Sequence, residues 1–330
     1  MEKNLANTEK WCCLLADSGS TKTDWALLDA DGLIMARQAT QGINPIHMTD
    51  EEILHTLSEE LRLPAIPTQV SFYGSGVTVA MKPRMERLLC QAFAGAEVEA
   101  QSDLLGAARA LFGKGRGIAC ILGTGANSGL YDGERIVRNT PPLGYILGDE
   151  GSGTALGKLF LNGIFKGLLP ASLRDGYLAA TGLTYADVID RVYRQPLANR
   201  YLASIAPFIS QRIAKGEQEG EGSEAAKEAM ALYEMVLGSF CQFYERNIVP
   251  YLDYLSDEPT LYSEEKWKVG FVGSVAHYFR QPLLDIFEKE HAQPVAAIVK
   301  APMEGLVKYH TEIFRTVTEK RIEKKVKFAK

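Results

Sequence analysis

Short apolar runs separated by turn-forming residues open the chain and predict a sheet. The runs are residues 11–16 (WCCLLA), Asp24–Leu28 and residues 33–39. A turn-prone stretch, Asp17-Ser18-Gly19-Ser20-Thr21, follows the first run, and Asp31-Gly32 after the second is a hairpin signal. The pattern therefore predicts three consecutive strands joined by tight turns.

Helical periodicity then alternates with further apolar runs. In residues 49–61, Thr49 is a candidate N-cap, acids fill the first turn and the apolar residues share one face. The further predicted elements are strands at Val70–Tyr73 and Glu97–Ala100 and helices at residues 83–94 and 103–112. Strands mixed with helices are typical of the α/β class.

The opening pattern returns later in the chain. An apolar run at Ile118–Leu122 leads into a Gly- and Thr-rich turn at Gly123–Ser128, and Gly129–Tyr131 leads to a second hairpin signal at Asp132-Gly133. We interpret the recurrence as an internal duplication. Two copies of this strand meander with crossover helices predict two similar domains with a cleft between them.

Residues beyond 150 are predicted to be mostly helical. Helical periodicity covers residues 154–168, 185–195, 201–215, 223–247 and 303–320. Gly216–Gly222 is interpreted as an acidic surface loop, and residues 268–272 as a strand that ends at Gly273-Ser274. The last eleven residues contain six Lys or Arg and are predicted to be a solvated tail.

Length and charge narrow the functional classes. A chain of 330 residues predicts about two domains, and 46% apolar with 23% charged residues is an ordinary globular balance. A formal net charge of −5 without a concentrated basic face argues against nucleic-acid and membrane-surface binding. No apolar run approaches the roughly 18 residues of a membrane span, and the first ten residues do not resemble a signal peptide. We therefore expect a cytoplasmic protein.

The cysteines and histidines show no metal-site pattern. The five cysteines are Cys12, Cys13, Cys90, Cys120 and Cys241. Their number is odd and no CxxC spacing occurs, which favours reduced thiols over disulfides or over zinc, iron–sulfur and dithiol sites. The five histidines show no ligand spacing either.

The two Gly/hydroxyl turns are the first candidates for chemistry. Such turns leave backbone N–H groups free to bind an anion, and glycine lets the backbone approach a phosphate closely. One such turn is more often a simple hairpin, but two in matching positions favour a polyphosphate site. The P-loop pattern fails because Gly157-Lys158 is followed by Leu159. The dinucleotide fingerprint fails because Ser128 stands where its third glycine belongs.

Three carboxylates near these turns are the second set of candidates. Asp103, at a predicted helix start after a strand, is either a general base or a first-turn acid. Asp149, beside Glu150, either caps a helix or accepts hydrogen bonds from sugar hydroxyls. Asp17 would repel phosphate unless a cation lies between them, which indicates Mg²⁺, with an Asx-turn as the alternative. The residues alone leave these alternatives open.

Taken together, these motifs resemble the sugar kinase, Hsp70 and actin superfamily. Asp17–Asp24 is similar to its first phosphate motif, Ile121–Ser128 to its second, and Gly270–Ser274 to its adenosine motif. Within it, the chain most resembles the N-acetylglucosamine kinase family, which groups with activator ATPases of benzoyl-CoA reductase. Gly144–Gly153 is the most specific element, and the motifs occur in order over residues 14 to about 305.

The resemblance implies an α/β fold of two actin-like (ribonuclease H-like) domains with a nucleotide and sugar cleft between them. Residues 1–115, joined by the C-terminal helix at about 305–330, would form one domain, and residues 116–304, with a helical insertion, the other. The implied activity is ATP- and Mg²⁺-dependent phosphorylation of an amino sugar, first of all N-acetylglucosamine at O6. The implied partner is the small-molecule sugar, and family members are often homodimers.

The resemblance also implies roles for single residues. Asp103 matches the general base that takes the proton from the sugar 6-hydroxyl, and Asp17 would hold Mg²⁺ through water. The implied ATP contacts are Gly19, Ser20, Thr21 and Lys22, then Gly123, Thr124 and Gly125, and at the adenine Gly273 and Ser274. The implied sugar contacts are Asn44, Asp103, Asn127, Gly144 and Asp149.

The chain departs from the family pattern just before Gly144. It has Pro141-Pro142-Leu143 where vertebrate-type enzymes place Gly and Trp at the sugar. It also lacks the His/Cys zinc motif of repressor-type glucokinases and the glycine-flanked cluster cysteines of the activator ATPases. The alternatives are a kinase for glucosamine or N-acetylmuramic acid, a partner-activating ATPase without a sugar substrate, and a non-catalytic sugar- or nucleotide-binding module.

Overall fold

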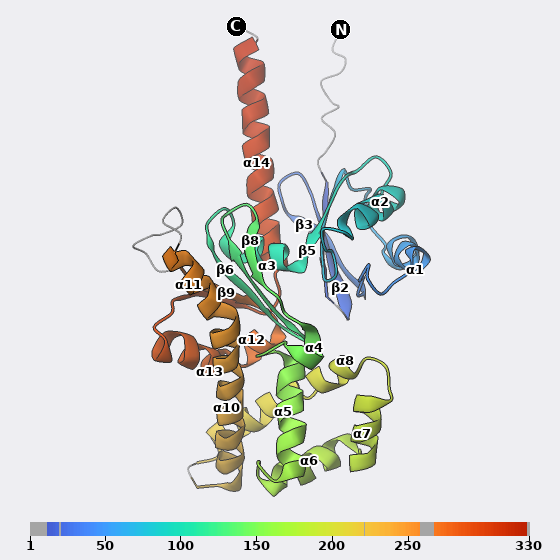
Figure 1. The fold of residues 1–330 in the computed structure, drawn as a ribbon. Helices are drawn as coiled ribbons and strands as arrows, with labels where there is room; N and C mark the ends of the chain where they lie inside the picture. The colour runs from blue at the N-terminus through green and yellow to red at the C-terminus, as the bar shows by residue number, and fades with distance from the viewer. Residues whose placement is uncertain (1–11, 20, 221, 258–266, 329–330) are drawn as a thin grey trace. The chain divides into compact units, whose positions relative to one another are not determined.

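The computed structural model describes residues 12–19, 21–220, 222–257 and 267–328, with side chains through 316 (Figure 1). The chain divides into two compact units. Unit 1 comprises Met1–Gly115 and Pro302–Lys330, and unit 2 comprises Arg116–Ala301. Each unit contains a five-stranded sheet of mixed direction. The α/β class predicted from the sequence is confirmed.

The sheet of unit 1 has the strand order β3-β2-β1-β4-β5. Its strands are β1 (Cys13–Ser18), β2 (Lys22–Leu28), β3 (Ile34–Gln41), β4 (Gln69–Gly74) and β5 (Glu97–Ser102). The first three form the predicted antiparallel meander, whereas β1, β4 and β5 run parallel. The carboxyl ends of these parallel strands therefore meet at one edge of the sheet.

Helices cover both faces of this sheet. They are α1 (Asp50–His55), continued by a single π-helical segment η1 (Thr56–Glu60), then α2 (Lys82–Ala92), α3 (Asp103–Phe112) and α14 (Met303–Phe328). Thr49 caps α1 in a reciprocal capping box with Glu52, as its sequence indicates. Successive residues of β1 alternate between the two cores, with Leu14 in one and Leu15 in the other.

A buried polar network fastens α14, the last part of the chain, to unit 1. The Tyr73 hydroxyl lies 2.8 Å from Nε2 of His310 in α14 and accepts a hydrogen bond of 2.7 Å from Arg109 in α3. Burial lowers the pKa of His310 to about 4, so its imidazole is neutral at physiological pH. Because buried polar groups are costly when unpaired, this network specifies where α14 docks.

The sheet of unit 2 repeats the meander of unit 1. Its strands are β6 (Gly117–Leu122), β7 (Ala126–Tyr131), β8 (Ile136–Thr140), β9 (Val269–Val272) and β10 (Val295–Val299). The order is β10-β9-β6-β7-β8, with β6, β7 and β8 antiparallel and β6, β9 and β10 parallel. The predicted recurrence of strand, Gly-rich turn, strand and Asp-Gly turn is confirmed.

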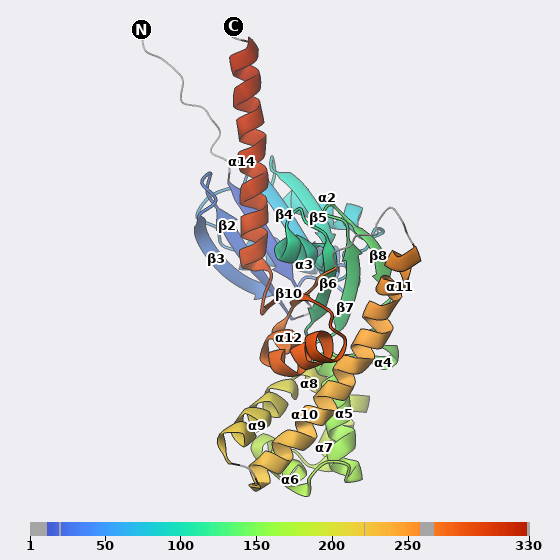
Figure 2. The ribbon, with the colours of Figure 1, turned by 90° about the vertical axis from the view of Figure 1, so that its left-hand side faces the viewer.

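Unit 2 also carries a large group of helices (Figure 2). They are α4 (Gly144–Leu147), α5 (Gly153–Lys166), α6 (Ala171–Thr181), α7 (Tyr185–Tyr193), α8 (Ala198–Ala203), α9 (Ala206–Gln218), α10 (Glu224–Phe243), η2 (Tyr244–Ile248), α11 (Val249–Asp257), α12 (Ser274–Tyr278), α13 (Arg280–Leu284) and η3 (Asp285–Glu290). Helices α5 to α10 gather at one end of the sheet, and α9 packs along α10. None of the described helices is long and apolar enough to cross a membrane.

Several boundaries in unit 2 differ from the prediction. The predicted helix 201–215 is divided into α8 and α9, and Gly216 lies buried inside α9 rather than in an acidic loop. Asn127 lies in β7, one residue past its start, rather than in the turn. Strand β10 was not predicted, because its five residues include two alanines and little of the strand is buried.

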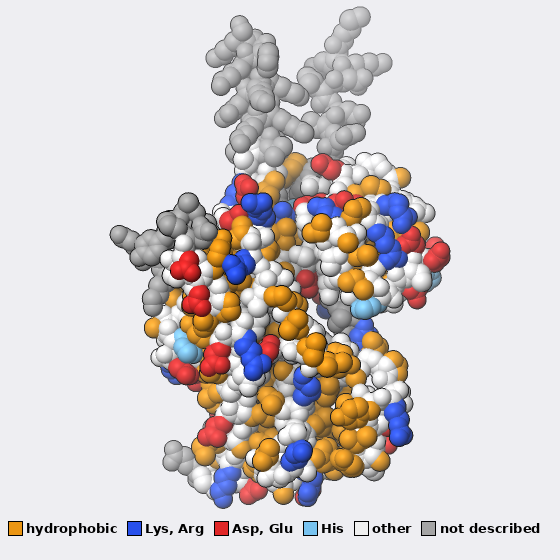
Figure 3. Space-filling model, in the orientation of Figure 1, with side chains coloured by type: hydrophobic (Ala, Val, Ile, Leu, Met, Phe, Trp, Pro, Cys, Tyr) orange, Lys and Arg blue, Asp and Glu red, His pale blue; other side chains and the backbone are white. Residues whose placement is uncertain are grey.

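The Lys- and Arg-rich end of the chain, which was predicted to be a solvated tail, is helical. Helix α14 continues through Phe328, and the side chains of the basic run lie outside the described residues. On the face of the molecule in Figure 3, Lys and Arg alternate with Asp and Glu among the described side chains.

Helix α9 packs closely against α10 at Gly216, and this contact gives a test of the fold. A Cβ at this position would lie 2.2 Å from Cβ of Ala229 and 2.4 Å from the carbonyl oxygen of Ala225. We expect Gly216→Ala to lower the free energy of unfolding of unit 2 by about 1–3 kcal/mol, as overpacking does. The measurement is thermal and urea unfolding followed by circular dichroism.

Gly238, also a helical glycine, is the matched control. A Cβ there meets no atom within 4 Å. Gly238→Ala should therefore raise the stability by about 0.5–1 kcal/mol, because it removes only the entropic cost of glycine in a helix. Equal effects of the two substitutions would contradict the packing described.

Candidate functional site

Two carboxylates lie at the edge of unit 1 where the parallel strands end. Asp17 is the penultimate residue of β1, opposite Asp24 of β2, and Asp103 is the first residue of α3, directly after β5. Burial, then the charges of Asp103 and Asp24, raise the pKa of Asp17 to about 7. Burial also raises the pKa of Asp103 to about 6. The two acids are close enough to influence each other's protonation.

The local structure around Asp103 fits the interpretation as a first-turn acid, and its role as a general base stays a prediction. Ser102 is the N-cap of α3, and its hydroxyl accepts from the backbone N–H of Leu105 at 3.2 Å. The Asp103 carboxylate is a first-turn acid, since Oδ1 accepts from the N–H of Leu104 at 2.8 Å. This bond holds the carboxylate in place at the start of α3.

Asn44 lies at the same edge of unit 1. The preceding residue Ile43 donates its N–H to the buried hydroxyl of Ser18, the last residue of β1, at 2.9 Å, and accepts from that hydroxyl at 3.0 Å. Oδ1 of Asn44 accepts from the N–H of Ile46. The side chain packs against Gly76, where a Cβ would lie 2.2 Å from Oδ1 and where φ is +81°. Only glycine therefore fits in this turn after β4.

The first Gly/hydroxyl turn connects β1 to β2. Gly19 donates its N–H to the carbonyl oxygen of Lys22 at 3.0 Å, and Thr21 accepts from the N–H of Gly42. The Lys22 ammonium pairs with Asp24 at 2.9 Å in a half-exposed position. Ser20 lies outside the described residues. The structure thus brings Gly19, Thr21 and Lys22 to the same strand ends as Asp17.

The start of α5 donates hydrogen bonds to the second Gly/hydroxyl turn, Gly123-Thr124-Gly125. The N–H of Gly153 donates to the Gly123 carbonyl at 2.8 Å, and both the N–H and the hydroxyl of Thr154 donate to the Thr124 carbonyl, at 3.1 and 2.5 Å. Within the described part of the chain, the N–H groups of Thr124 and Gly125 have no acceptor. They are the donors that an anion would use.

Asp149 is bound to this same turn. Its buried Oδ1 accepts from the N–H of Ala126 at 3.1 Å, and its backbone N–H donates to the carbonyl of Pro142. Burial raises its pKa, and its φ of +59° is unusual for a residue other than glycine. Asp149 therefore positions the turn, whether or not it also contacts a sugar.

The adenosine motif lies next to the second turn. Gly273, between β9 and α12, has φ +132°, and a Cβ there would lie 2.1 Å from the Leu122 carbonyl. Ser274 begins α12. The structure therefore brings Gly273 and Ser274 against the end of β6 and the start of the Gly123–Gly125 turn.

The other predicted sugar contacts in unit 2 take different local positions. Oδ1 of Asn127 accepts from the side-chain amide of Asn139 in β8 at 2.9 Å. Gly144 begins the short helix α4 with φ +71°, after Leu143 at φ +61°. Leu143 and the following Ile146 and Leu147 are exposed apolar side chains. Positive φ values at consecutive residues mark this segment as strained, as functional loops often are.

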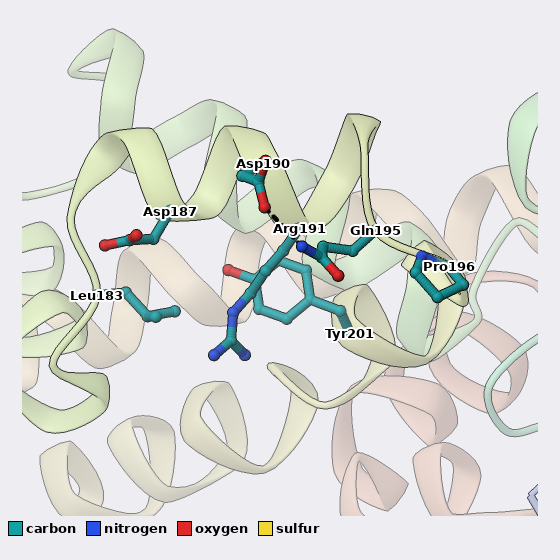
Figure 4. A pocket seen from close by; sticks show the side chains of 7 residues that line it. All are labelled: Leu183, Asp187, Asp190, Arg191, Gln195, Pro196 and Tyr201. Atoms are coloured by element: carbon teal, nitrogen blue, oxygen red, sulfur yellow. Dashed lines mark hydrogen bonds between the residues drawn. The ribbon is translucent and has the colours of Figure 1, made fainter.

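A hollow of about 440 Å³ in unit 2 lies apart from all these residues. Residues of α7 and of the segment that follows it line the hollow, including Asp190, Arg191 and Tyr201 (Figure 4). Asp190 accepts from the Gln195 side chain at 2.8 Å, and the Arg191 guanidinium lies over the Tyr201 ring. The hollow includes none of the predicted site residues.

Sequence reasoning missed residues that position the two turns. Ser18 bonds to both Ile43 and Thr23, and Thr154 bonds twice to Thr124. Thr154 follows Ser152, which caps α5, so the helix start could have been found from its capping pattern. Its contact with the turn could not, because it depends on how the start of α5 packs against the Gly123–Gly125 turn in the folded chain.

Three carboxylates lie near the first Gly/hydroxyl turn. Asp103 and Asp24 are close enough to Asp17 for their charges to raise its pKa, whereas Lys22 lowers it and pairs with Asp24. Carboxylate oxygens are ligands that Mg²⁺ prefers. Among the described residues these three acids do not form a ready-made three-ligand cluster, so the role of Asp17 in holding Mg²⁺ stays a prediction.

Comparison with solved structures gives a long list of similar chains. The chain is 40% identical to a putative N-acetylglucosamine kinase from Porphyromonas gingivalis, over 91% of this chain and 99% of that one, with a TM-score of 0.79. A putative N-acetylglucosamine kinase from Chromobacterium violaceum is 19% identical over 91% and 98%, with a TM-score of 0.63. No protein-family profile and no curated protein matches the chain.

A more distant likeness supports the fold alone. MreB 5 of Spiroplasma citri, solved with bound AMPPNP, is 12% identical over 95% of this chain and 98% of that one, with a TM-score of 0.50. The predicted actin-like architecture is confirmed by this likeness and by the two five-stranded sheets.

The raised pKa values of Asp17 and Asp103 predict how stability depends on pH. Both groups bind their proton more tightly in the folded chain than in the unfolded chain. The free energy of unfolding should therefore fall as the pH rises from about 4, where the unfolded carboxyls ionise, to about 7. Asp103→Asn should remove part of this slope and stabilise the protein at about pH 8 by about 1–2 kcal/mol.

The measurement is the unfolding midpoint of both proteins between about pH 5 and pH 8. Asp31→Asn, in an exposed turn of unit 1, is the control and should leave the slope unchanged. If Asp103→Asn keeps the wild-type slope, the buried acid pair does not have the raised pKa values described.

Proposed function

Because the chain belongs to the N-acetylglucosamine kinase family of ATP-dependent sugar kinases, we propose that it transfers the γ-phosphate of ATP to O6 of N-acetylglucosamine. Identity of 40% to the Porphyromonas gingivalis protein over 91% of the chain supports this substrate. The observation that carries the mechanism is the half-buried acid pair of Asp17 and Asp103 at the strand ends of unit 1.

Asp103 is the general base in this proposal. Its pKa of about 6 lies close to physiological pH, so the carboxylate is ionised in most molecules and is still a stronger base than an exposed aspartate. The N–H of Leu104 holds one of its oxygens, which orients the other. As the sugar hydroxyl attacks the γ-phosphorus, its proton passes to Asp103.

Asp17 is the residue proposed to hold Mg²⁺ through water. When bound, Mg²⁺ neutralises charge on the phosphates during transfer. Asp17 supplies the negative charge that this cation requires, and the nearby Asp24 is already paired with Lys22. Burial and the charges of Asp103 and Asp24 raise the pKa of Asp17, and a bound cation would lower it.

Backbone amides of the two Gly/hydroxyl turns are proposed to bind phosphates of ATP. Gly19, Ser20, Thr21 and Lys22 would contribute from unit 1, and Gly123, Thr124 and Gly125 from unit 2. In unit 2, the N–H groups of Thr124 and Gly125 point out of a turn whose carbonyl oxygens are already bonded to α5. Gly273 and Ser274 would lie at the adenine.

The sugar contacts are proposed to be Asn44, Asp103, Asn127, Gly144 and Asp149. The Nδ2 group of Asn44 has no hydrogen-bond partner among the described residues, so it can donate to a hydroxyl. Near Gly144, exposed Leu143 and Ile146 offer an apolar surface that suits an N-acetyl methyl group better than a charged amine.

The setting of the reaction is also a proposal. We place it in the cytoplasm, where ATP is plentiful and thiols remain reduced, because all five cysteines are unpaired. Units 1 and 2 would be the two actin-like domains, and a homodimer would be the assembly, as in other family members.

The first test replaces the general base. Asp103→Asn keeps the size of the side chain but removes the base, so we expect kcat with N-acetylglucosamine to fall about 10²- to 10⁴-fold. Sugar binding, measured by calorimetry, should persist. Asp31→Asn is the control and should retain wild-type kcat.

A sugar panel in the same ADP-release assay separates the candidate substrates. Wild-type protein should release ADP fastest with N-acetylglucosamine among N-acetylglucosamine, glucosamine, N-acetylmuramic acid, N-acetylmannosamine and glucose. Preference for another sugar would correct the substrate. ADP release independent of any sugar would indicate a partner-activating ATPase, and ATP-dependent stabilisation without release would indicate a binding module.

The second test concerns the phosphate turn of unit 2. Thr154→Val removes the hydroxyl that donates to the Thr124 carbonyl but keeps the backbone N–H bond. We expect the KM for ATP to rise about three- to tenfold, the equivalent of one hydrogen bond, with the KM for the sugar unchanged. Thr154→Ser keeps the hydroxyl and should behave like wild type. A KM for ATP that stays at the wild-type value in Thr154→Val would exclude the turn from the ATP site.

A further inference from the structure

Three side chains with metal-binding atoms meet in unit 2, at a place that the proposed kinase chemistry does not use. They are Cys241 on α10, and Glu290 and His291 at the end of η3. The thiol sulfur, one carboxylate oxygen and one imidazole nitrogen lie within 4.8 Å of one another. Helix α10 packs against α13 and η3 in this unit, so two segments about fifty residues apart in the chain supply the cluster.

A fourth donor lies beside the sulfur. The thiol of Cys241 donates to Oε1 of Glu245, one helical turn later, at 3.6 Å. Burial, followed by the charges of Glu245 and Glu290, raises the pKa of the Cys241 thiol, so both carboxylates lie near the sulfur. No Lys or Arg pairs with either of these carboxylates among the described residues. The nearest basic residues along the chain, Arg246 and Lys289, pair with other acids.

The imidazole of His291 supplies an independent observation. Its Nε2 atom is buried and makes no hydrogen bond, and the closest carboxylate oxygen, on Glu290, is 4.0 Å away. The ring stacks on Tyr244, with ring centres 3.9 Å apart and planes 6° apart. A buried ring nitrogen without a partner is costly, and a metal ion is one of the few groups that would satisfy it here.

We propose that Cys241, Glu290 and His291, with Glu245 as a fourth donor, bind one zinc ion. A thiolate, an imidazole and carboxylates form the donor set that zinc takes, whereas Mg²⁺ and Ca²⁺ prefer oxygen alone. Tetrahedral zinc bonds of about 2.0–2.3 Å place the ligand atoms roughly 3.3–3.7 Å apart, so rotation of exposed Glu290 and half-buried Cys241 closes the site. The ion would join α10 and η2 to the segment that leads into β10.

The sequence did not indicate this site, because its spacing matches no zinc motif. Cys241 and Glu245 are four residues apart on one helix face, while Glu290 and His291 come from the end of a π-helical segment. The prediction that cysteines and histidines hold no metal is therefore replaced by this proposal, which does not depend on the sugar kinase activity.

Cobalt(II) is the probe, because a cobalt–thiolate bond produces a sulfur-to-metal charge-transfer band. Full-length protein is freed of metal with a chelator, and Co²⁺ is then titrated in while absorbance is recorded. We expect one Co²⁺ per chain with a charge-transfer band and d–d bands of tetrahedral intensity. Displacement by Zn²⁺, followed by calorimetry, gives the zinc affinity.

Three variants make the assignment specific. Cys241→Ser and His291→Gln should lose the charge-transfer band and bind zinc at least about tenfold more weakly. Cys90→Ser, which removes an exposed thiol elsewhere, should behave like wild type. Circular dichroism of both metal-ligand variants, compared with that of wild type, checks that they are folded whatever the activity of the protein.

The proposal is overturned if wild-type protein shows no cobalt–thiolate band, or if the band remains in Cys241→Ser. It is also overturned if folded His291→Gln retains wild-type zinc affinity. Zinc should raise the melting temperature of wild type but not of Cys241→Ser, and equal shifts in both proteins would likewise contradict it.

Discussion

The parallel pairing of β1 with β4, and of β4 with β5, is the constraint on which the candidate active site depends. In this register Ser18 lies opposite Gly74, and Gly74 opposite Ser102, so the three strands end together. Beyond these residues, β1 and β4 continue into turns and β5 continues directly into α3. Asp17 and Asp103, which are far apart in the sequence, thus become neighbours without any contact that is specific to them. A shift of the register would separate them.

Much of this arrangement could be predicted from the sequence, because it depends on local signals. The capping pattern at Thr49, the hairpin signals and the helix start at Asp103 all specify backbone conformation within a few residues. The remaining features depend on packing. The acidic neighbours of Gly216 predict a loop, yet Gly216 lies in α9, at a contact where α10 leaves no room for a larger residue.

The loss of folding stability that Asp17 and Asp103 cause also bears on their role. Burial raises the pKa values of both Asp17 and Asp103, and the charges of Asp103 and Asp24 raise that of Asp17 further, so above neutral pH both charges destabilise the folded chain. A core selected for stability alone would replace at least one of them. Arg109, by contrast, is mostly buried and is paired. Its guanidinium donates to the Tyr73 hydroxyl and forms an ion pair with Glu99, so unit 1 does neutralise a charge whose role is structural. An unpaired acid pair beside a paired network indicates a ligand that is bound during function.

Comparison of the two repeated hairpins shows how the duplicated turns differ in chemistry. In unit 1, Asp17 faces Asp24 at the base of the turn, and like charges in directly opposite positions destabilise a sheet. In unit 2, the corresponding pair is Ile121 and Asn127, neither of which is charged. The acids at the base of the turn are therefore not a requirement of the hairpin itself. Only the first turn has carboxylates at opposite strand positions at its base, whereas the carboxylate at the second turn, Asp149, lies outside the hairpin and accepts from the N–H of Ala126. In the proposed function, both turns would bind phosphate, while proton transfer and cation binding would use the carboxylates of unit 1.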